Sequence, residues 1–124
     1  MSSTLPAPIR LFLRLELGKN VAIGPGKADP LQAIGETGLI SAAARRLGMG
    51  GKRAWLLVET MNAGFRGPLV HASRGGDGAG GARLTTKGAA VRAAYRALEK
   101  DAAQPAALHV QAIARLARPA LARP

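Results

Sequence analysis

Lys52 and Arg53 follow the glycine pair Gly50 and Gly51 at the start of a predicted helix. The amino-terminal end of a helix carries partial positive charge, so cations in the first turn lower helix stability unless that end faces an anion. The phosphate backbone of nucleic acid is a large anion of this kind. The sequence therefore predicts phosphate binding at this position, with Lys52 and Arg53 as contacts.

The residues around these cations predict the elements that hold them. Ser41 is a suitable N-cap for a helix through Leu47, and Gly48 can take the left-handed conformation that ends this helix. A second helix covers about residues 51–63. Two short helices joined by a glycine turn, with basic residues opening the second, are typical of a helix-turn-helix. The second helix is then the expected recognition helix.

The charge of the chain favours a polyanionic partner. The 124 residues carry a formal net charge of +11, and residues 41–96 hold ten Lys or Arg (45, 46, 52, 53, 66, 74, 83, 87, 92 and 96) against two acids (59 and 77). Nucleic acid is the first expected partner and an anionic membrane surface the second. Aromatic residues make up only 3% of the chain, which favours duplex DNA over stacked single-stranded RNA. Arg45 and Arg46 are further candidate contacts.

The remaining elements complete one domain. Residues 1–8 are expected to be a flexible arm and residues 104–124 a basic tail rich in alanine and proline, which leaves a domain at 9–103. The period-two pattern of residues 9–17 predicts a strand, which pairs with a short strand at 21–23 in a hairpin. A helix follows at about 28–37, with Asp29 as its N-cap and Pro30 at its first position.

A second hairpin is predicted at 68–73 and 82–85, with a glycine-rich tip between its strands. This hairpin matches the wing of a winged helix-turn-helix, and Arg74 and Arg83 flank its tip. A longer helix follows at 86–103. It carries the apolar stripe Val91, Tyr95 and Leu98, which is too apolar to leave in water, so we expect the stripe to form a homodimer interface.

Several other chemistries find no support in the sequence. Gly76, Gly78 and Gly81 match a dinucleotide fingerprint formally, but they lie in a hairpin tip instead of opening a helix. His71 and His109 lack carboxylate or thiolate partners at metal-ligand spacing. The chain has no cysteine, and no apolar run approaches the ~20 residues of a membrane span. We therefore expect no enzyme, no metal site, no cofactor and no membrane partner.

The same residues resemble a known family. The stretch 38–49, the Lys-Arg-Ala-Trp element at 52–55, Pro-Leu-Val at 68–70 and Gly-Gly-Ala-Arg-Leu-Thr at 80–85 resemble the amino-terminal DNA-binding domain of the molybdate-responsive ModE regulators, which is related to the LysR-type helix-turn-helix. The resemblance covers about residues 9–103. It implies that Ser41 and Gly51 also meet DNA, beside Lys52 and Arg53, with Arg74 and Arg83 in the wing. The sequence departs from the family in one respect: we expect no molybdate-binding domain after it, and therefore a stand-alone domain.

Together these patterns predict a mostly α fold with small β elements: a winged helix-turn-helix with an amino-terminal β-hairpin and a long carboxy-terminal dimerisation helix. The expected function is transcription regulation by a homodimer that binds duplex DNA, in a cytoplasmic, nucleoid-associated protein with an unknown effector. Two alternatives remain open at this point. One is an architectural nucleoid protein without sequence specificity, and the other is a winged-helix module that binds a partner protein.

Overall fold

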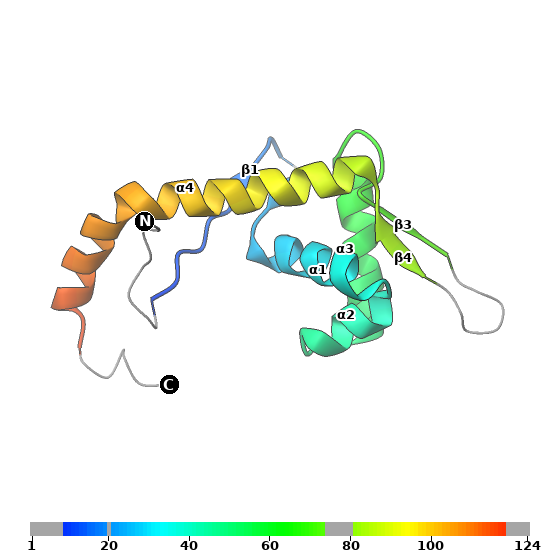
Figure 1. Ribbon diagram of the computed structural model, residues 1–124, viewed down its shortest axis with the longest axis horizontal. Coiled ribbons are helices and arrows are strands. Elements are labelled where there is room, and N and C mark those ends of the chain that lie inside the picture. The colour runs from blue at the N-terminus through cyan, green and yellow to red at the C-terminus, as the bar shows by residue number, and fades with distance from the viewer. Residues whose placement is uncertain (1–8, 20, 74–80, 119–124) are drawn as a thin grey trace.

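The computed structural model describes residues 9–19, 21–73 and 81–118 (Figure 1). Four helices and two small antiparallel sheets make up this part of the chain. The helices are α1 (Pro25–Thr37), α2 (Ile40–Arg46), α3 (Gly51–Gly64) and α4 (Thr86–Leu116). One sheet pairs β1 (Leu15–Glu16) with β2 (Ala22–Ile23), and the other pairs β3 (Val70–Ala72) with β4 (Ala82–Leu84). The glycine-rich tip with Arg74 lies outside the described residues.

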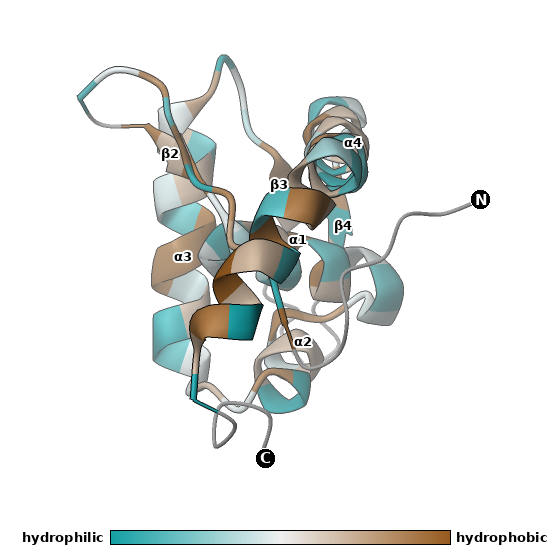
Figure 2. Cartoon of the chain, turned by 90° about the vertical axis from the view of Figure 1, so that its left-hand side faces the viewer, coloured by the Kyte–Doolittle hydropathy of each residue, from teal (hydrophilic) through white to brown (hydrophobic). Residues whose placement is uncertain are grey.

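The core forms around α1, which lies between α3 and α4 in the view of Figure 2. Leu31 and Ile34 of α1 are fully buried, as are Met61 of α3 and Leu69 just before β3. Small residues on α2, Ala43 and Ala44, are also buried in this cluster and allow the helices to approach closely. These buried residues place one apolar face of each of the three helices in the core.

The start of α1 differs from the prediction. The helix begins at Pro25 after Gly24, so Asp29 and Pro30 lie inside it. Asp29 does not cap the helix; its carboxylate instead binds Arg96 of α4 at 2.9 Å and Arg10 at 3.3 Å. Pro25 already supplies the fixed φ that favours a first helical position, which extends the helix by one turn. The helix ends as expected at Gly38, whose φ is +77°.

The amino-terminal strand is much shorter than its alternating pattern predicts. Only Leu15 and Glu16 pair with β2, whereas residues 9–14 lie along the protein without a strand partner among the described residues. One attachment is made by Tyr95 of α4, whose hydroxyl donates to the carbonyl of Leu13 at 2.7 Å. The alternation therefore marks a segment with one half-buried side that packs against a helix without forming a ladder.

Burial of Tyr95 within the chain bears on the predicted dimer interface. Its side chain is 3% exposed and packs against Ile23 and Ala28, with Val91 half-buried beside it. Leu98 is half-buried as well. Tyr95 is thus covered by its own chain, whereas Val91 and Leu98 are half-buried, and their pairing with a second copy stays a prediction.

Replacing Tyr95 with phenylalanine should lower the free energy of unfolding by about 1 kcal/mol at neutral pH, because the hydrogen bond to Leu13 is lost. Burial raises the pKa of Tyr95 above its ordinary value of 10.0. The folded state therefore holds this proton more tightly than the unfolded state, so wild-type stability should fall as the pH rises above about 10. Urea unfolding from pH 7 to 11 measures the difference between the two proteins, which should shrink across that range.

Tyr95 is the single tyrosine of the chain, so tyrosinate absorbance reports this residue alone. A titration midpoint in the folded protein at or below that of the urea-unfolded protein would show that the hydroxyl is not buried as described.

The second hairpin is anchored by one side chain. The amide oxygen of Asn62 on α3 accepts from the backbone N–H groups of Leu69 (2.8 Å) and Val70 (3.1 Å), and its amide nitrogen donates to the carbonyl of Val70 (3.0 Å). Beyond β3, Ala82 donates its backbone N–H to Gly38 at 2.9 Å, which ties β4 to the end of α1. The hairpin is thus fixed to both α1 and α3.

Helix α4 begins at a well-formed cap and runs further than predicted. The Thr85 hydroxyl accepts from the backbone N–H of Gly88 at 2.9 Å and donates to the carbonyl of Pro68 at 2.7 Å. The helix continues to Leu116, across residues 103 and 104, where the sequence suggests a boundary. Pro105 lies inside it, and Figure 1 shows the helix bending downward in its orange part, as a proline within a helix causes.

The predicted fold class is corrected accordingly. Among the described residues the structure combines four helices with two separate two-stranded sheets, and it departs from the prediction at the amino terminus, where the expected nine-residue strand is reduced to Leu15–Glu16. The prediction failed where it read apolar patterns as surfaces for pairing: residues 9–14 and Tyr95 pack against each other within one chain.

Candidate functional site

Four acidic side chains of the described residues form ion pairs with arginines. Glu16 pairs with Arg14, Glu36 with Arg46, and Glu99 with Arg96, which also pairs with Asp29. The bonds from Gln32 and Arg46 lower the pKa of Glu36. These pairs neutralise the arginines of the amino-terminal segment, α2 and α4 that take part in them. Apart from Arg10, which also binds Asp29, the other Lys and Arg side chains within residues 9–19, 21–73 and 81–118 have no ion-pair partner.

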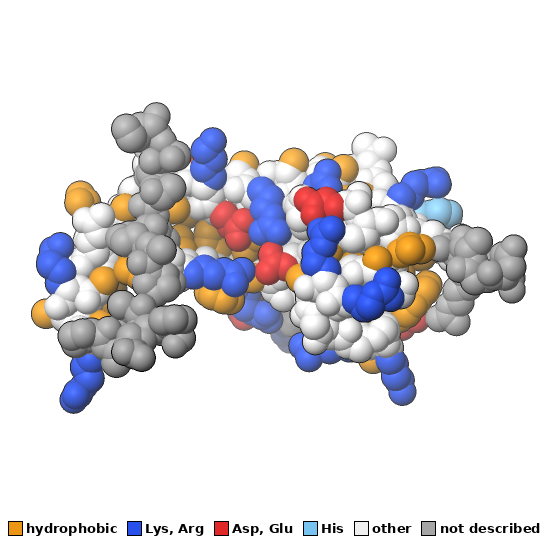
Figure 3. Space-filling model, turned by 60° about the horizontal axis from the view of Figure 1, so that its bottom comes forward, with side chains coloured by type: hydrophobic (Ala, Val, Ile, Leu, Met, Phe, Trp, Pro, Cys, Tyr) orange, Lys and Arg blue, Asp and Glu red, His pale blue; other side chains and the backbone are white. Residues whose placement is uncertain are grey.

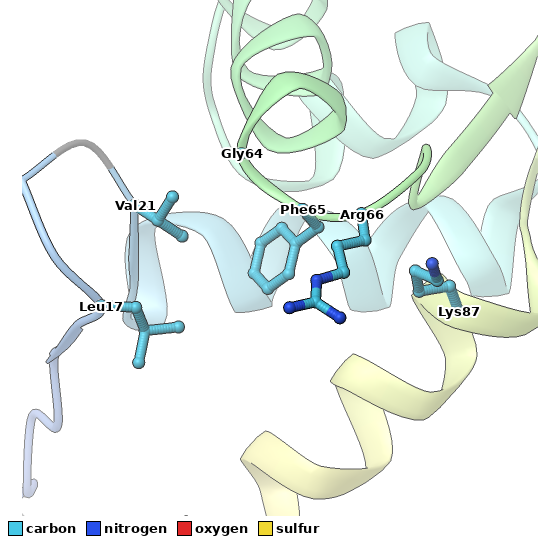
Figure 4. Close-up of a pocket in the computed structure, with 6 residues that line it drawn as sticks. All are labelled: Leu17, Val21, Gly64, Phe65, Arg66 and Lys87. Carbon is cyan, nitrogen blue, oxygen red and sulfur yellow. The ribbon is translucent and has the colours of Figure 1, made fainter.

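Two such cations face one pocket of about 600 Å³ at the carboxy-terminal end of α3. We call it the basic pocket; it is lined by Leu17, Val21, Gly64, Phe65, Arg66 and Lys87. Figure 4 shows both side chains at the pocket: the Arg66 guanidinium projects beside the Phe65 ring, and the Lys87 ammonium points toward the turn that follows Arg66. Leu17 and Val21 face them from the β1–β2 hairpin. Within the described ranges, neither cation has an ion-pair partner.

Local backbone structure brings the two cations together although they are far apart in sequence. Helix α3 ends at Gly64, and the chain turns at Gly67, whose φ is +102° and whose N–H donates to Phe65 at 2.8 Å. A Cβ on Gly67 would lie 3.4 Å from the Lys87 ammonium nitrogen. The cap at Thr85 sets the start of α4, so Lys87 stands in its first turn beside this turn of the backbone.

The basic pocket suits a small oxyanion. A guanidinium offers a planar fork of donors and an ammonium offers three donors around a point charge, so together they can bond several oxygens of one tetrahedral dianion. Leu17, Val21 and Phe65 form the apolar wall beside these donors. Across the described ranges, no three His, Asp or Glu side chains gather to hold a metal cation. The groups present therefore favour a negatively charged ligand.

The structure places the cations predicted from sequence on several surfaces. Ser41, Arg45, Gly51, Lys52, Arg53 and Arg83 are all exposed. Gly51 to Arg53 open α3 as predicted, but Arg46 is bound to Glu36, and Arg83 lies opposite His71 in the β3–β4 ladder. On the face in Figure 3 the blue side chains are spread out and do not form one patch.

Sequence reasoning did not assign a role to Arg66 or Lys87, although both were counted among the basic residues. Their separation of twenty-one positions gives no periodic signal. The local signal is a glycine directly after Arg66 and a Thr-Thr pair directly before Lys87, which mark a tight turn and a helix start. Only the fold shows that these two features are neighbours.

Relatives of this chain carry names that refer to molybdenum. The chain is 45% identical over 82 residues to the molybdenum-pterin-binding protein MopB of Rhodobacter capsulatus, which covers 66% of this chain and 30% of that protein. It is 38% identical over 92 residues to MopA of the same organism (74% and 35%), and 36% identical over 98 residues to the molybdenum transport protein ModE of Herbaspirillum seropedicae (79% and 36%). The chain thus spans about a third of the length of these relatives. No family model matches it.

These names correct four expectations. All four predictions concern DNA: the recognition as a stand-alone ModE-type DNA-binding domain, the function in transcription regulation, the winged helix-turn-helix and the duplex DNA partner. The three names concern the binding and transport of molybdenum, and they are names of binding and transport proteins, not of enzymes. The physical reason for the error is that net positive charge attracts any anion. It does not distinguish the phosphates of DNA from a small oxyanion.

The helices differ from membrane-spanning helices. Among the described residues, no helix combines the length and the apolar character needed to cross a bilayer. Even α4, with 31 residues, carries charged side chains along its length.

Proposed function

We propose that this chain is the part of a molybdenum-handling protein that binds a molybdenum oxyanion, without catalysing a reaction. The observation that carries the proposal is the 45% identity over 82 residues to a protein named for binding a molybdenum pterin. The cation pair of the basic pocket supports it, because molybdate is a tetrahedral oxygen dianion. The relatives are about three times longer, so their further length can add ligands that this chain does not carry.

Arg66 and Lys87 are the expected anion contacts. Each would donate charge-assisted hydrogen bonds, which are about twice as strong as neutral ones. The pocket opens to solvent and both side chains are exposed, so screening weakens each contact. We expect each cation to contribute about 1–1.5 kcal/mol to binding, which corresponds to about a tenfold change in Kd.

The double variant Arg66→Gln, Lys87→Gln should weaken molybdate binding about a hundredfold. Isothermal titration calorimetry with sodium molybdate at about 0.15 M ionic strength measures this effect. A matched control is Arg45→Gln, Lys100→Gln, which removes the same charge at exposed positions outside the pocket. The control should bind molybdate like the wild type.

Equal weakening by both double variants would show that only net charge attracts the anion. Unchanged binding by the folded Arg66→Gln, Lys87→Gln protein would move the site away from the basic pocket. Circular dichroism of each variant establishes that the protein is folded.

A further inference from the structure

A second pocket, of about 450 Å³, lies at the other end of α3. We call it the aromatic pocket; its walls include Phe12, Arg14, Pro25, Lys27, Arg53 and Leu57. It shares no lining residue with the basic pocket. Arg53 and Gly64 are eleven residues apart on one helix, which is about 16 Å at the rise of an α-helix. One small ligand cannot fill both pockets.

The apolar wall of this pocket includes an aromatic ring that is exposed to solvent. Phe12 is 63% exposed, in a chain with few aromatic residues. The ring is nevertheless held in place: the Arg10 guanidinium carbon lies 4.3 Å from its centroid, and Arg10 is bound in turn to Asp29. Asp29 is fixed by Arg96 of α4. An exposed ring that is already ordered offers stacking area at little further entropy cost.

The polar wall carries three cations from three segments of the chain. Lys27 donates one hydrogen bond to the carbonyl of Ala22 at 3.0 Å, which leaves two of its three donors free. Arg14 is paired with Glu16 through its Nε, so we assign the anion to the other two cations. Arg53 is exposed and has no ion-pair partner among the described residues. Among the described residues, no acidic side chain lines the pocket.

An aromatic ring beside three cations matches one kind of small ligand. We propose that the aromatic pocket binds a planar heteroaromatic ring that carries a phosphate monoester. The ring stacks on Phe12 against the apolar side of Pro25 and Leu57, and the phosphate is bound by Arg53 and Lys27. This goes beyond the molybdate site proposed above and does not depend on it.

The test uses the fluorescence of 6-hydroxymethylpterin phosphate, titrated with the full chain. The unphosphorylated pterin and inorganic phosphate are the two part-ligands, and guanosine 5′-monophosphate is a second bicyclic ring with a phosphate, which competes with the fluorescent probe. We expect saturable binding of the phosphorylated pterin, at least tenfold tighter than either part-ligand. Competition by the nucleotide would assign the pocket to ring-phosphates in general, and its absence would assign it to pterins.

Substitutions test the contributions of the apolar wall and the polar wall separately. Phe12→Ala should weaken binding of the phosphorylated pterin about tenfold and leave the affinity for inorganic phosphate unchanged. Phe12→Trp should retain binding of the phosphorylated pterin. Arg53→Gln should weaken binding of both the phosphorylated pterin and inorganic phosphate. Leu56→Ala and Arg45→Gln, exposed residues outside the pocket, are the matched controls and should have no effect.

Two results would overturn the proposal. One is an affinity for inorganic phosphate equal to that for the phosphorylated pterin, and the other is an Arg45→Gln effect as large as that of Arg53→Gln. The Arg66→Gln, Lys87→Gln protein should still bind the pterin, so a failure here is distinguishable from a failure of the molybdate site.

Discussion

Substitution of Gly88 by alanine should destabilise the protein by more than about 3 kcal/mol. A Cβ at this position would lie 2.9 Å from the carbonyl carbon of Leu69 and closer still to its oxygen. The obstacle is backbone, which cannot rotate aside as a long side chain can. Leu69 itself is fully buried, and its carbonyl accepts from the backbone N–H of Thr85 at 2.9 Å. Relief of the clash would therefore move β3 and the start of α4 apart.

Urea unfolding followed by circular dichroism measures this loss. The matched control is Gly51→Ala, because a Cβ on Gly51 has no neighbour within 4 Å and the residue also lies in the first turn of a helix. The control should be neutral or slightly stabilising, since alanine is favoured over glycine in helices by up to about 1 kcal/mol. Equal stability of the two alanine variants would mean that α4 does not approach Leu69 as closely as described.

Substitution of Asn62 by alanine should cost about 2–4 kcal/mol of stability, because two backbone donors and one acceptor at Leu69 and Val70 lose their partner. Leu69 and Val70 are buried, so water reaches these groups poorly. The same substitution should weaken molybdate binding, since the segment from Asn62 to Leu69 carries Arg66. Thermal unfolding and calorimetric titration of one preparation give both effects.

Asn62→Asp separates the hydrogen bonds from the side-chain volume. A carboxylate can still accept from Leu69 and Val70, but it cannot donate to the Val70 carbonyl. Its stability should lie between those of the wild type and the alanine variant. An alanine variant as stable as the wild type would show that the anchor described for β3 contributes nothing.

Local signals predicted the separate elements well. The helix expected at about 51–63 is α3, Gly51–Gly64, and the strands expected at 68–73 and 82–85 contain β3 and β4. These elements follow from apolar periodicity and from glycine and threonine at their ends, which act within a few residues. The same reasoning failed for residues 9–14, whose alternation records packing against Tyr95.

The candidate site could not be predicted for a different reason. Arg66 and Lys87 become neighbours only because Asn62 holds β3 and because Gly88 lets α4 approach Leu69. Each of these contacts joins residues that are not periodic in sequence. Charge and position at a helix start pointed to Lys52 and Arg53, which are exposed at the start of α3. Charge also suggested duplex DNA, because the sign of a patch does not specify which anion it binds.

The measurement that tests the central claim most directly is calorimetric titration of the wild-type chain with molybdate, with sulfate and a polyanion such as heparin as controls at the same ionic strength. We predict saturable binding of one molybdate per chain, tighter than sulfate and dependent on Arg66 and Lys87. Absence of molybdate binding in a protein that still binds the polyanion would contradict the proposed function.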